Sequence, residues 1–254
     1  MNLLKTSVLN GVAVLIKTIT LFVLNKILAV YLGPTGYAAL GQFQNFIQMV
    51  TTFAGSAINT AVIKYTAEYH EDESKQRAIW KTAGSIVFVF SLMFAFLILI
   101  FQRQLSLYIF HTLEYQTVFV WFAVFLLFFN FNTLFLAILN GKKEILKLVL
   151  ANIAGSLFAL IVTSILAIKL HLYGALIALS IYQSIAFIVT LFLCYRADWF
   201  KFSSLFGKID LEITKKFSSF IWMALVSAIC VPLSQMLIRA YLSQEFGLAY
   251  AGYW

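Results

Sequence analysis

Long runs of apolar residues, separated by short polar segments, occupy almost the whole chain. A helix needs about 20 mostly apolar residues to cross the hydrocarbon core of a bilayer. Runs of about that length cover residues 7–32, 37–63, 82–101, 115–140, 145–168, 172–195 and 217–242. A soluble core of this size does not need seven such segments, so the pattern predicts an all-α, polytopic bundle of transmembrane helices.

The segments between the runs predict how the bundle is divided. Gly33-Pro34-Thr35-Gly36 predicts a tight turn between the first two spans, because Pro and Gly end a helix and reverse the chain. We expect residues 1–196 to form a first lobe of six spans. Residues 197–216 are expected to form a linker. Residues 217–254 are expected to form the seventh span and the stub of the eighth.

Apolar residues recur at helical spacing in the linker. They are Trp199, Phe202, Leu205, Phe206, Ile209 and Ile213, with charged residues on the other faces. This pattern predicts an amphipathic helix that lies in the membrane interface and tethers two groups of spans. A plain linker is the alternative.

A faint internal repeat indicates that the second group of spans is incomplete. The segment from Tyr31 to Gly36 has a counterpart from Tyr241 to Gly247, at an offset of 210 residues between the two Tyr positions. This offset fits a unit of six spans repeated in parallel, as in some transporters. Trp254 then falls inside span eight, and we expect the chain to be an N-terminal fragment of a longer protein with a truncated second lobe.

The basic residues are distributed unevenly between the two sides of the predicted bundle. The chain is 62% hydrophobic and 11% charged, with a formal net charge of +8. Of the 18 Lys and Arg residues, 13 lie at the N-terminus and in the even-numbered loops, and three lie on the other side. Basic short loops stay in the cytoplasm, so we expect a cytoplasmic N-terminus. Because topology accounts for the positive charge, no nucleic-acid partner is expected.

Three cations lie inside predicted spans. Lys17 is about ten residues into span one, on the order of 15 Å deep at a rise of about 1.5 Å per residue. A lysine at that depth costs roughly 2.5–3.5 kcal/mol and usually faces a water-filled path. We predict that Lys17, Lys26 and Arg239 bind an anionic group. The alternatives are that Lys17 pairs with a carbonyl or hydroxyl group inside the bundle and that Lys26 reaches the interface.

Uncharged polar residues recur on one helical face in each of five spans. One such stripe would suit packing between helices, whereas five predict a shared polar interior whose amide and hydroxyl groups suit sugar hydroxyls. Packing remains the alternative for each stripe. The candidate substrate-binding residues of this interior are Asn45, Gln48, Asn59, Asn130, Asn152, Gln183 and Gln235.

Several functional classes find no support in the sequence. All ten Asp and Glu residues map to loops or span ends, so no carboxylate relay for a coupling ion is predicted. The three His and two Cys residues are scattered without the spacing of a metal site. No nucleophile or phosphate-loop motif occurs, and we expect neither an enzyme nor a cofactor.

Three stretches of the chain resemble one family of membrane proteins. They are Lys26–Gly36 (KILAVYLGPTG), Lys64–His70 (KYTAEYH) and Met223–Pro232 (MALVSAICVP) with Arg239 after it. In this order they are similar to the Wzx-type flippases of bacterial polysaccharides such as O-antigen and enterobacterial common antigen. These flippases belong to the multidrug/oligosaccharidyl-lipid/polysaccharide exporter superfamily. One departure lies at Ala54–Ala57, where a relative carries a second glycine.

The resemblance implies a fold and a substrate. The family has two lobes around a central cavity, of which this chain would supply the first, span seven and a stub. The substrate would be an undecaprenyl-pyrophosphate-linked oligosaccharide, moved from the cytoplasmic to the periplasmic leaflet of the bacterial inner membrane. Membrane lipids and the polysaccharide polymerase machinery are the other expected partners. A multidrug exporter of the same superfamily, a membrane enzyme acting on polyprenyl lipids, and an inactive membrane fragment or scaffold remain alternatives.

Overall fold

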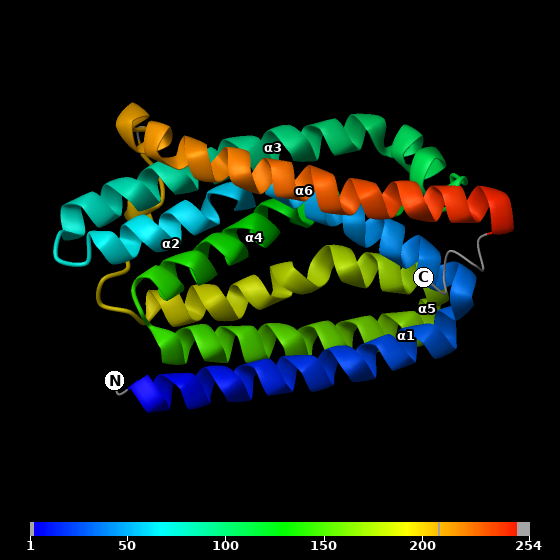
Figure 1. Ribbon diagram of the computed structural model, residues 1–254, viewed down its shortest axis with the longest axis horizontal. Coiled ribbons are helices and arrows are strands. Elements are labelled where there is room, and N and C mark those ends of the chain that lie inside the picture. The colour runs from blue at the N-terminus through cyan, green and yellow to red at the C-terminus, as the bar shows by residue number, and fades with distance from the viewer. Residues whose placement is uncertain (1–2, 208, 248–254) are drawn as a thin grey trace.

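Helices form almost all of the fold. The computed structural model describes residues 3–207 and 209–247. The helices are α1 (Leu3–Phe53), α2 (Asn59–Glu68), α3 (Glu73–Phe110), α4 (Gln116–Gly141), α5 (Ile145–Tyr195) and α6 (Leu211–Phe246). Five of them, all but α2, are long and apolar enough to cross a membrane, and they run along the long axis of the molecule (Figure 1). This confirms the predicted all-α bundle.

Two of the long helices fold back on themselves. α1 breaks at Gly33, where φ is 65° and ψ is 179°, and α5 breaks at His171, where φ is 48° and ψ is −132°. After each break the second half of the helix returns toward the end from which the first half came (Figure 1). The five long helices therefore make seven passes, and the turn predicted at Gly33 is confirmed.

The break in α5 depends on a glycine that follows it closely. A Cβ on Gly174 would overlap the carbonyl oxygen of Leu166, which belongs to the first half of α5. Only glycine lets the second half of the helix start this close to the backbone of the first. The sharp return of the chain at His171 therefore rests on the missing side chain at Gly174.

Span two is divided near its middle. The predicted run over residues 37–63 is not one helix, because α1 ends at Phe53, a 3-10 turn, η1, covers Ser56–Ile58, and α2 begins at Asn59. The cause is Gly55, whose φ of 149° lies in a region that residues with side chains rarely adopt.

Span three is longer than the predicted run over residues 82–101. It begins at Glu73, because Asp72 caps the helix by accepting hydrogen bonds from the backbone N–H groups of Ser74 and Lys75, both at 3.1 Å. The first turns of α3 are polar, so hydropathy alone places the start of the helix too late.

The linker after α5 does not form the amphipathic helix predicted within residues 197–216, in the part that the structure describes. It contains one 3-10 turn, η2 (Phe202–Ser204), and α6 already begins at Leu211. Leu205 is buried and the ring of Trp199 lies 5.3 Å from that of Trp80 in α3, whereas Phe202, Phe206 and Ile209 are exposed. The helical spacing of these residues was therefore misleading, because the linker folds against α3 as a largely irregular segment.

The backbone of the linker lies directly on α3. A Cβ on Gly84 would overlap the carbonyl oxygen of Leu205, whose own side chain is 1% exposed. Nearby, the hydroxyl of Ser85 donates to the carbonyl oxygen of Gly207 at 2.9 Å. The linker thus fastens the start of α6 to α3.

The connections rich in Lys and Arg share one end of the bundle. The N-terminal end of α1 and the connections α2–α3, α4–α5 and α5–α6 lie at the left of Figure 1, and the turns inside α1 and α5 lie at the right. The fold thus has the separation of charge on which the predicted orientation rests, while the orientation itself and the division into lobes stay predictions. The predicted stub of span eight falls mainly on residues 248–254, which lie outside the described residues.

We expect Gly84→Ala to destabilise the protein by about 1–3 kcal/mol, because the added methyl group must displace the linker backbone. Unfolding in detergent, followed by tryptophan fluorescence, measures the change. Gly11→Ala is the matched control, since Gly11 also lies inside a helix and a Cβ there meets nothing within 4 Å; the helix preference of Ala should raise stability by up to about 1 kcal/mol. Equal stability of the two variants would contradict the close contact.

Asp72 should make stability depend on acid pH. The Ser74 hydroxyl, and then the Lys75 N–H, lower the pKa of the Asp72 carboxyl from 3.8 to about 2. A lowered pKa stabilises the folded state above the ordinary value, and this contribution disappears as pH falls from about 4 to about 2. The difference in melting temperature between wild type and Asp72→Ala should therefore shrink over that interval. A difference that stays constant over that interval would contradict this role of Asp72.

Candidate functional site

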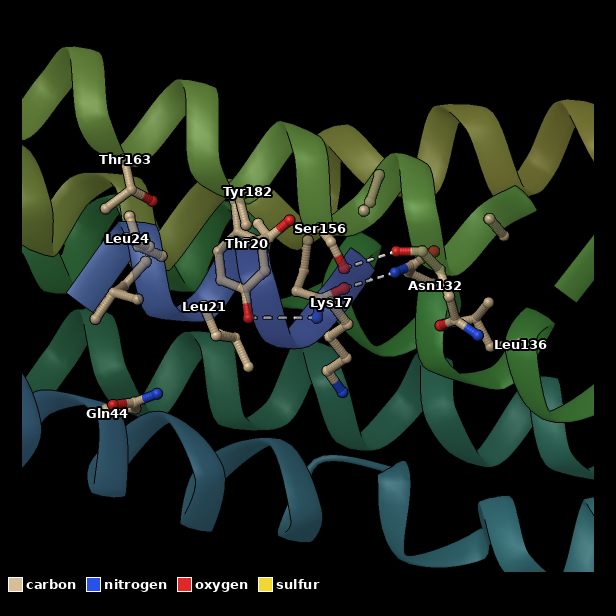
Figure 2. Close-up of a pocket in the computed structure, with 17 residues that line it drawn as sticks. Lys17, Thr20, Leu21, Leu24, Gln44, Asn132, Leu136, Ser156, Thr163 and Tyr182 are labelled. Carbon is tan, nitrogen blue, oxygen red and sulfur yellow. Dashed lines mark hydrogen bonds between the residues drawn. The ribbon is translucent and has the colours of Figure 1, made fainter. Parts of the chain in front are cut away.

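A polar cavity of about 210 Å³ lies among α1, α4 and α5 (Figure 2). Both halves of α1 and both halves of α5 contribute to its wall, so the two turns of the chain assemble it. Its polar lining residues are Lys17, Thr20, Gln44, Asn132, Asn152, Ser156, Thr163, Tyr182 and Gln183. Among the described residues of the lining there is no Asp or Glu.

Small residues of α5 leave the space that the cavity fills. Ala151, Gly155 and Ala159 follow one another at four-residue spacing and therefore lie on one helical face, and all three line the cavity. Larger side chains on this face would project into the cavity. The cavity thus has a signal in the sequence, which is the row of small residues at four-residue spacing on α5.

Lys17 supplies the charge of this cavity. Its side chain is exposed and projects from the first half of α1 among the polar residues (Figure 2). An ammonium group offers three hydrogen-bond donors and no acceptor. In surroundings of low dielectric constant its attraction for an anion is much stronger than in bulk water. The lining therefore favours a ligand that is polar and carries negative charge at one end.

A chain of hydrogen bonds fixes the inner wall of the cavity. The amide Nδ2 of Asn132 donates to Oε1 of Gln183 at 2.7 Å, and Nε2 of Gln183 donates to the hydroxyl of Tyr182 at 3.3 Å. Asn132 is 1% exposed, so this chain is anchored in the interior of α4. The side chains of Gln183 and Tyr182 are held in place before any ligand arrives.

Three of the predicted site residues meet in this cavity. Lys17 from span one, Asn152 from span five and Gln183 from span six all line it. Lys26 is exposed on α1 and is absent from the described lining of this cavity. The cations at positions 17 and 26 therefore do not form a single cluster here.

Arg239 lines a different cavity of about 360 Å³, between α1, the end of α3 and α6. Its guanidinium group lies against Gly41, where a Cβ would overlap Nη1 of Arg239. Gly41 is thus the position that lets the Arg239 side chain lie across span two. The second cavity is at the opposite end of the bundle from the basic connections, since the C-terminal half of α6 lies there (Figure 1).

Asn130 holds the interruption of span two together. Its Nδ2 donates to the hydroxyl of Ser91 at 2.9 Å, and that hydroxyl donates to the carbonyl oxygen of Ala54 at 3.1 Å. Asn130 and Ser91 are both 0% exposed. The break at Gly55 frees the Ala54 carbonyl from the helix, and the Ser91 hydroxyl, itself held by Asn130, satisfies it. This geometry gives Asn130 a structural contact, and its predicted role in substrate binding stays a prediction.

The remaining predicted residues are absent from the described linings of both cavities. Asn45 is buried, Gln48 is exposed, and Asn59 and Gln235 are half-buried. The stripe predicted along span two is divided by the break at Gly55, because Asn59 belongs to a separate helix, α2. Their roles in substrate binding stay predictions.

Sequence reasoning missed Thr20, Gln44, Asn132 and Tyr182 among the polar residues of the lining. Thr20 could have been found, because it follows Lys17 by three positions and so shares its helical face. For Asn132 and Tyr182 no such signal exists, because each precedes a residue of a predicted polar stripe, Thr133 or Gln183, and the local sequence does not show which of the two neighbours faces the cavity.

A family described as polysaccharide biosynthesis protein matches residues 3–254 of the chain. The lipid III flippases of Escherichia coli (strain K12) and Shigella flexneri are each 25% identical to it over 255 residues. Each alignment covers 100% of this chain and 61% of the relative. The chain therefore spans less than two thirds of the length of these relatives.

Solved structures of transporters share the fold. An inward-facing multidrug resistance MATE family transporter of the MOP superfamily gives a TM-score of 0.70 at 16% identity, covering 89% of this chain and 53% of that one. The outward-facing conformation of such a transporter gives 0.67 at 18% identity, covering 96% and 58%. A MOP superfamily transporter from Pyrococcus furiosus gives 0.70 at 16% identity, covering 96% and 56%. At these identities the likeness concerns the fold alone.

We expect Ser91→Ala and Asn130→Ala each to destabilise the protein by about 1–3 kcal/mol, because the first leaves the Ala54 carbonyl and the Asn130 amide without partners and the second removes a buried hydrogen bond and leaves a void. In the double variant the two costs should add incompletely, since both side chains belong to one network. Unfolding in detergent measures all three variants.

Gln48→Ala is the control, an amide of the span-two stripe at an exposed position, with an expected change below about 0.5 kcal/mol. Unchanged stability of Asn130→Ala together with reduced transport would instead restore the predicted binding role of Asn130.

Proposed function

The chain belongs to the polysaccharide biosynthesis protein family, and from this we propose that it forms the first part of a flippase for a lipid-linked oligosaccharide. The flippase moves the head group of an undecaprenyl-pyrophosphate-linked oligosaccharide from the cytoplasmic to the periplasmic leaflet of the bacterial inner membrane. The observation that carries the proposal is the polar cavity with Lys17 as its cation and no acid in its described lining.

The cavity lowers the main free-energy cost of translocation, which is the removal of the sugar from water. Each hydroxyl or amide of a sugar loses its hydrogen bonds to water when it enters hydrocarbon, at a cost of roughly 2–7 kcal/mol per group. Side chains that donate and accept hydrogen bonds inside the bundle replace those of water. Asn152, Ser156 and Gln183 offer such groups, and the small residues of α5 make room for the sugar beside them.

Lys17 binds the pyrophosphate of the substrate in this proposal. A lysine binds phosphate as a compact charge with three donors, and the membrane surroundings strengthen the attraction. Arg239 lines the second cavity at the far end of the bundle, where a phosphate group would arrive after translocation. The two cations thus act at successive positions along the path rather than in one site.

The direction and the pathway follow from the charge of the loops and from the relatives. The basic connections favour a cytoplasmic N-terminus, on the side where lipid-linked precursors would be assembled. The lipid III flippases among the relatives support a role in surface polysaccharide synthesis, such as that of enterobacterial common antigen or O-antigen. The polysaccharide polymerase machinery would receive the product.

An exporter of cationic drugs fits the cavity less well. A cationic ligand would meet Lys17, and no carboxylate in the described lining would offset the repulsion. The likeness to multidrug transporters is one of fold and does not favour this alternative.

We expect Lys17→Ala to lower export of surface polysaccharide by about 10- to 100-fold in a full-length version of the protein, since a hydrogen bond to a charged group contributes about 1.5–3 kcal/mol. The measurement is an immunoblot of surface polysaccharide in a strain that lacks its own flippase, at equal protein level.

Lys26→Ala is the matched control, because it removes a lysine from the same helix at a position outside the described lining. Lys17→Arg should keep part of the activity. Normal polysaccharide export by Lys17→Ala, or an equal loss of export in Lys26→Ala, would contradict the role given to Lys17.

A further inference from the structure

Tyr182 stands apart from the other residues that line the polar cavity. It is the aromatic residue of the described lining, and the other members are aliphatic, amide, hydroxyl or small residues and Lys17. Figure 2 shows its ring beside the cavity, with the hydroxyl directed toward the middle of the lining. The side chain thus combines an apolar face and a polar tip in one place.

The faces of the Tyr182 ring are not used by aromatic packing in the described part of the chain. Many rings of this bundle pair with one another; on α5 itself, for example, Phe187 packs on Phe128 and Phe135 at 5.7 and 5.6 Å. No such pair involves Tyr182 among the described residues. Its ring contacts the cavity instead, together with the small residues Gly155 and Ala159.

The hydroxyl of Tyr182 is oriented so that its proton remains available. Gln183 Nε2 donates to the hydroxyl oxygen, and Gln183 is itself held by Asn132. Because the phenol oxygen acts as acceptor in this chain, its own O–H group can donate to a ligand. The donor direction is set by three side chains from two helices and needs no rearrangement when a ligand binds.

A sugar ring has the complementary chemistry. One face of a pyranose presents C–H groups and is apolar, while its edge presents hydroxyl groups. An aromatic face beside hydrogen-bonding groups accommodates both, and binding sites of this kind are mostly apolar with a few placed polar groups. A cavity of about 210 Å³ holds about one such ring rather than a whole oligosaccharide.

We propose that Tyr182 is the sugar-recognising residue of this cavity: one sugar ring stacks on its aromatic face and accepts a hydrogen bond from its hydroxyl. The inference rests on the proposed function, because it assigns the sugar to Tyr182 and leaves the pyrophosphate to Lys17. The two residues therefore divide one substrate between them, and they should respond differently to a substrate that lacks its sugar.

The test uses the full-length protein in lipid nanodiscs and two probes. One is undecaprenyl pyrophosphate without sugar, and the other is the lipid-linked oligosaccharide isolated from the same organism. Binding is measured by native mass spectrometry. We expect Tyr182→Phe, which keeps the ring, to bind the sugar-bearing lipid about 5-fold more weakly, and Tyr182→Leu about 30-fold more weakly. Neither change should alter the affinity for undecaprenyl pyrophosphate.

Two controls separate recognition from structure. Tyr173→Leu removes a tyrosine of α5 whose hydroxyl lies 3.0 Å from that of Thr117, outside the described lining, and should leave the ratio of the two affinities unchanged. Lys17→Ala should weaken the binding of both lipids by a similar factor. A thermal unfolding curve for each variant identifies any loss of folding.

Each outcome decides one claim. If Tyr182→Leu weakens the binding of both lipids equally, or of neither, Tyr182 does not recognise the sugar. The flippase proposal stands in that case as long as the wild-type protein binds both lipids. If the folded wild-type protein binds neither lipid, the proposed function itself fails. An equal loss of affinity for the sugar-bearing lipid in Tyr182→Phe and Tyr182→Leu would contradict the stacking contact and assign sugar recognition to the hydroxyl alone.

Discussion

Inside a membrane, every backbone N–H and C=O group needs a partner from the protein, and this constraint governs where the chain can leave the helix. The interruption in span two shows how it is met. Gly55 makes the turn, and the carbonyl of Ala54 that loses its helical partner receives the Ser91 hydroxyl, which in turn is held by Asn130. Asn130, an amide that resembles a ligand-binding residue, therefore holds the hydroxyl that satisfies this backbone carbonyl.

The same constraint explains why the polar cavity lies where it does. The chain turns back at Gly33 and at His171, so that four helical segments of α1 and α5 surround one space together with α4. Polar side chains facing that space would be costly against lipid, and inside it Asn132 and Gln183 hydrogen-bond to each other. The cavity is thus a consequence of antiparallel packing combined with the small residues of α5.

Contacts at the two ends of the bundle hold this arrangement. At the end with the basic connections, the Lys142 ammonium lies 5.9 Å from the ring of Trp80 and 5.5 Å from that of Trp199, and it donates to Gln76 Oε1 at 3.1 Å. At the other end, Arg239 lies against Gly41. The linker that leads into α6 is therefore held against α3 and the α4–α5 connection at one end, and α6 itself lies against α1 at the other.

Hydropathy by itself determined the class of the fold and the number of passes, because a bilayer imposes a length and a composition on every span. The Gly and Pro residues of the first connection determined the turn at Gly33. Charge distribution determined which connections share an end, and the depth of Lys17 marked one true member of the cavity lining. Only the tertiary structure decided which amide faces that lining. Asn130 and Asn132 lie two residues apart and so point to nearly opposite sides of α4; one closes a backbone gap and the other supports Gln183. Nothing in the local sequence separates them, since the difference lies in the helix that each one meets.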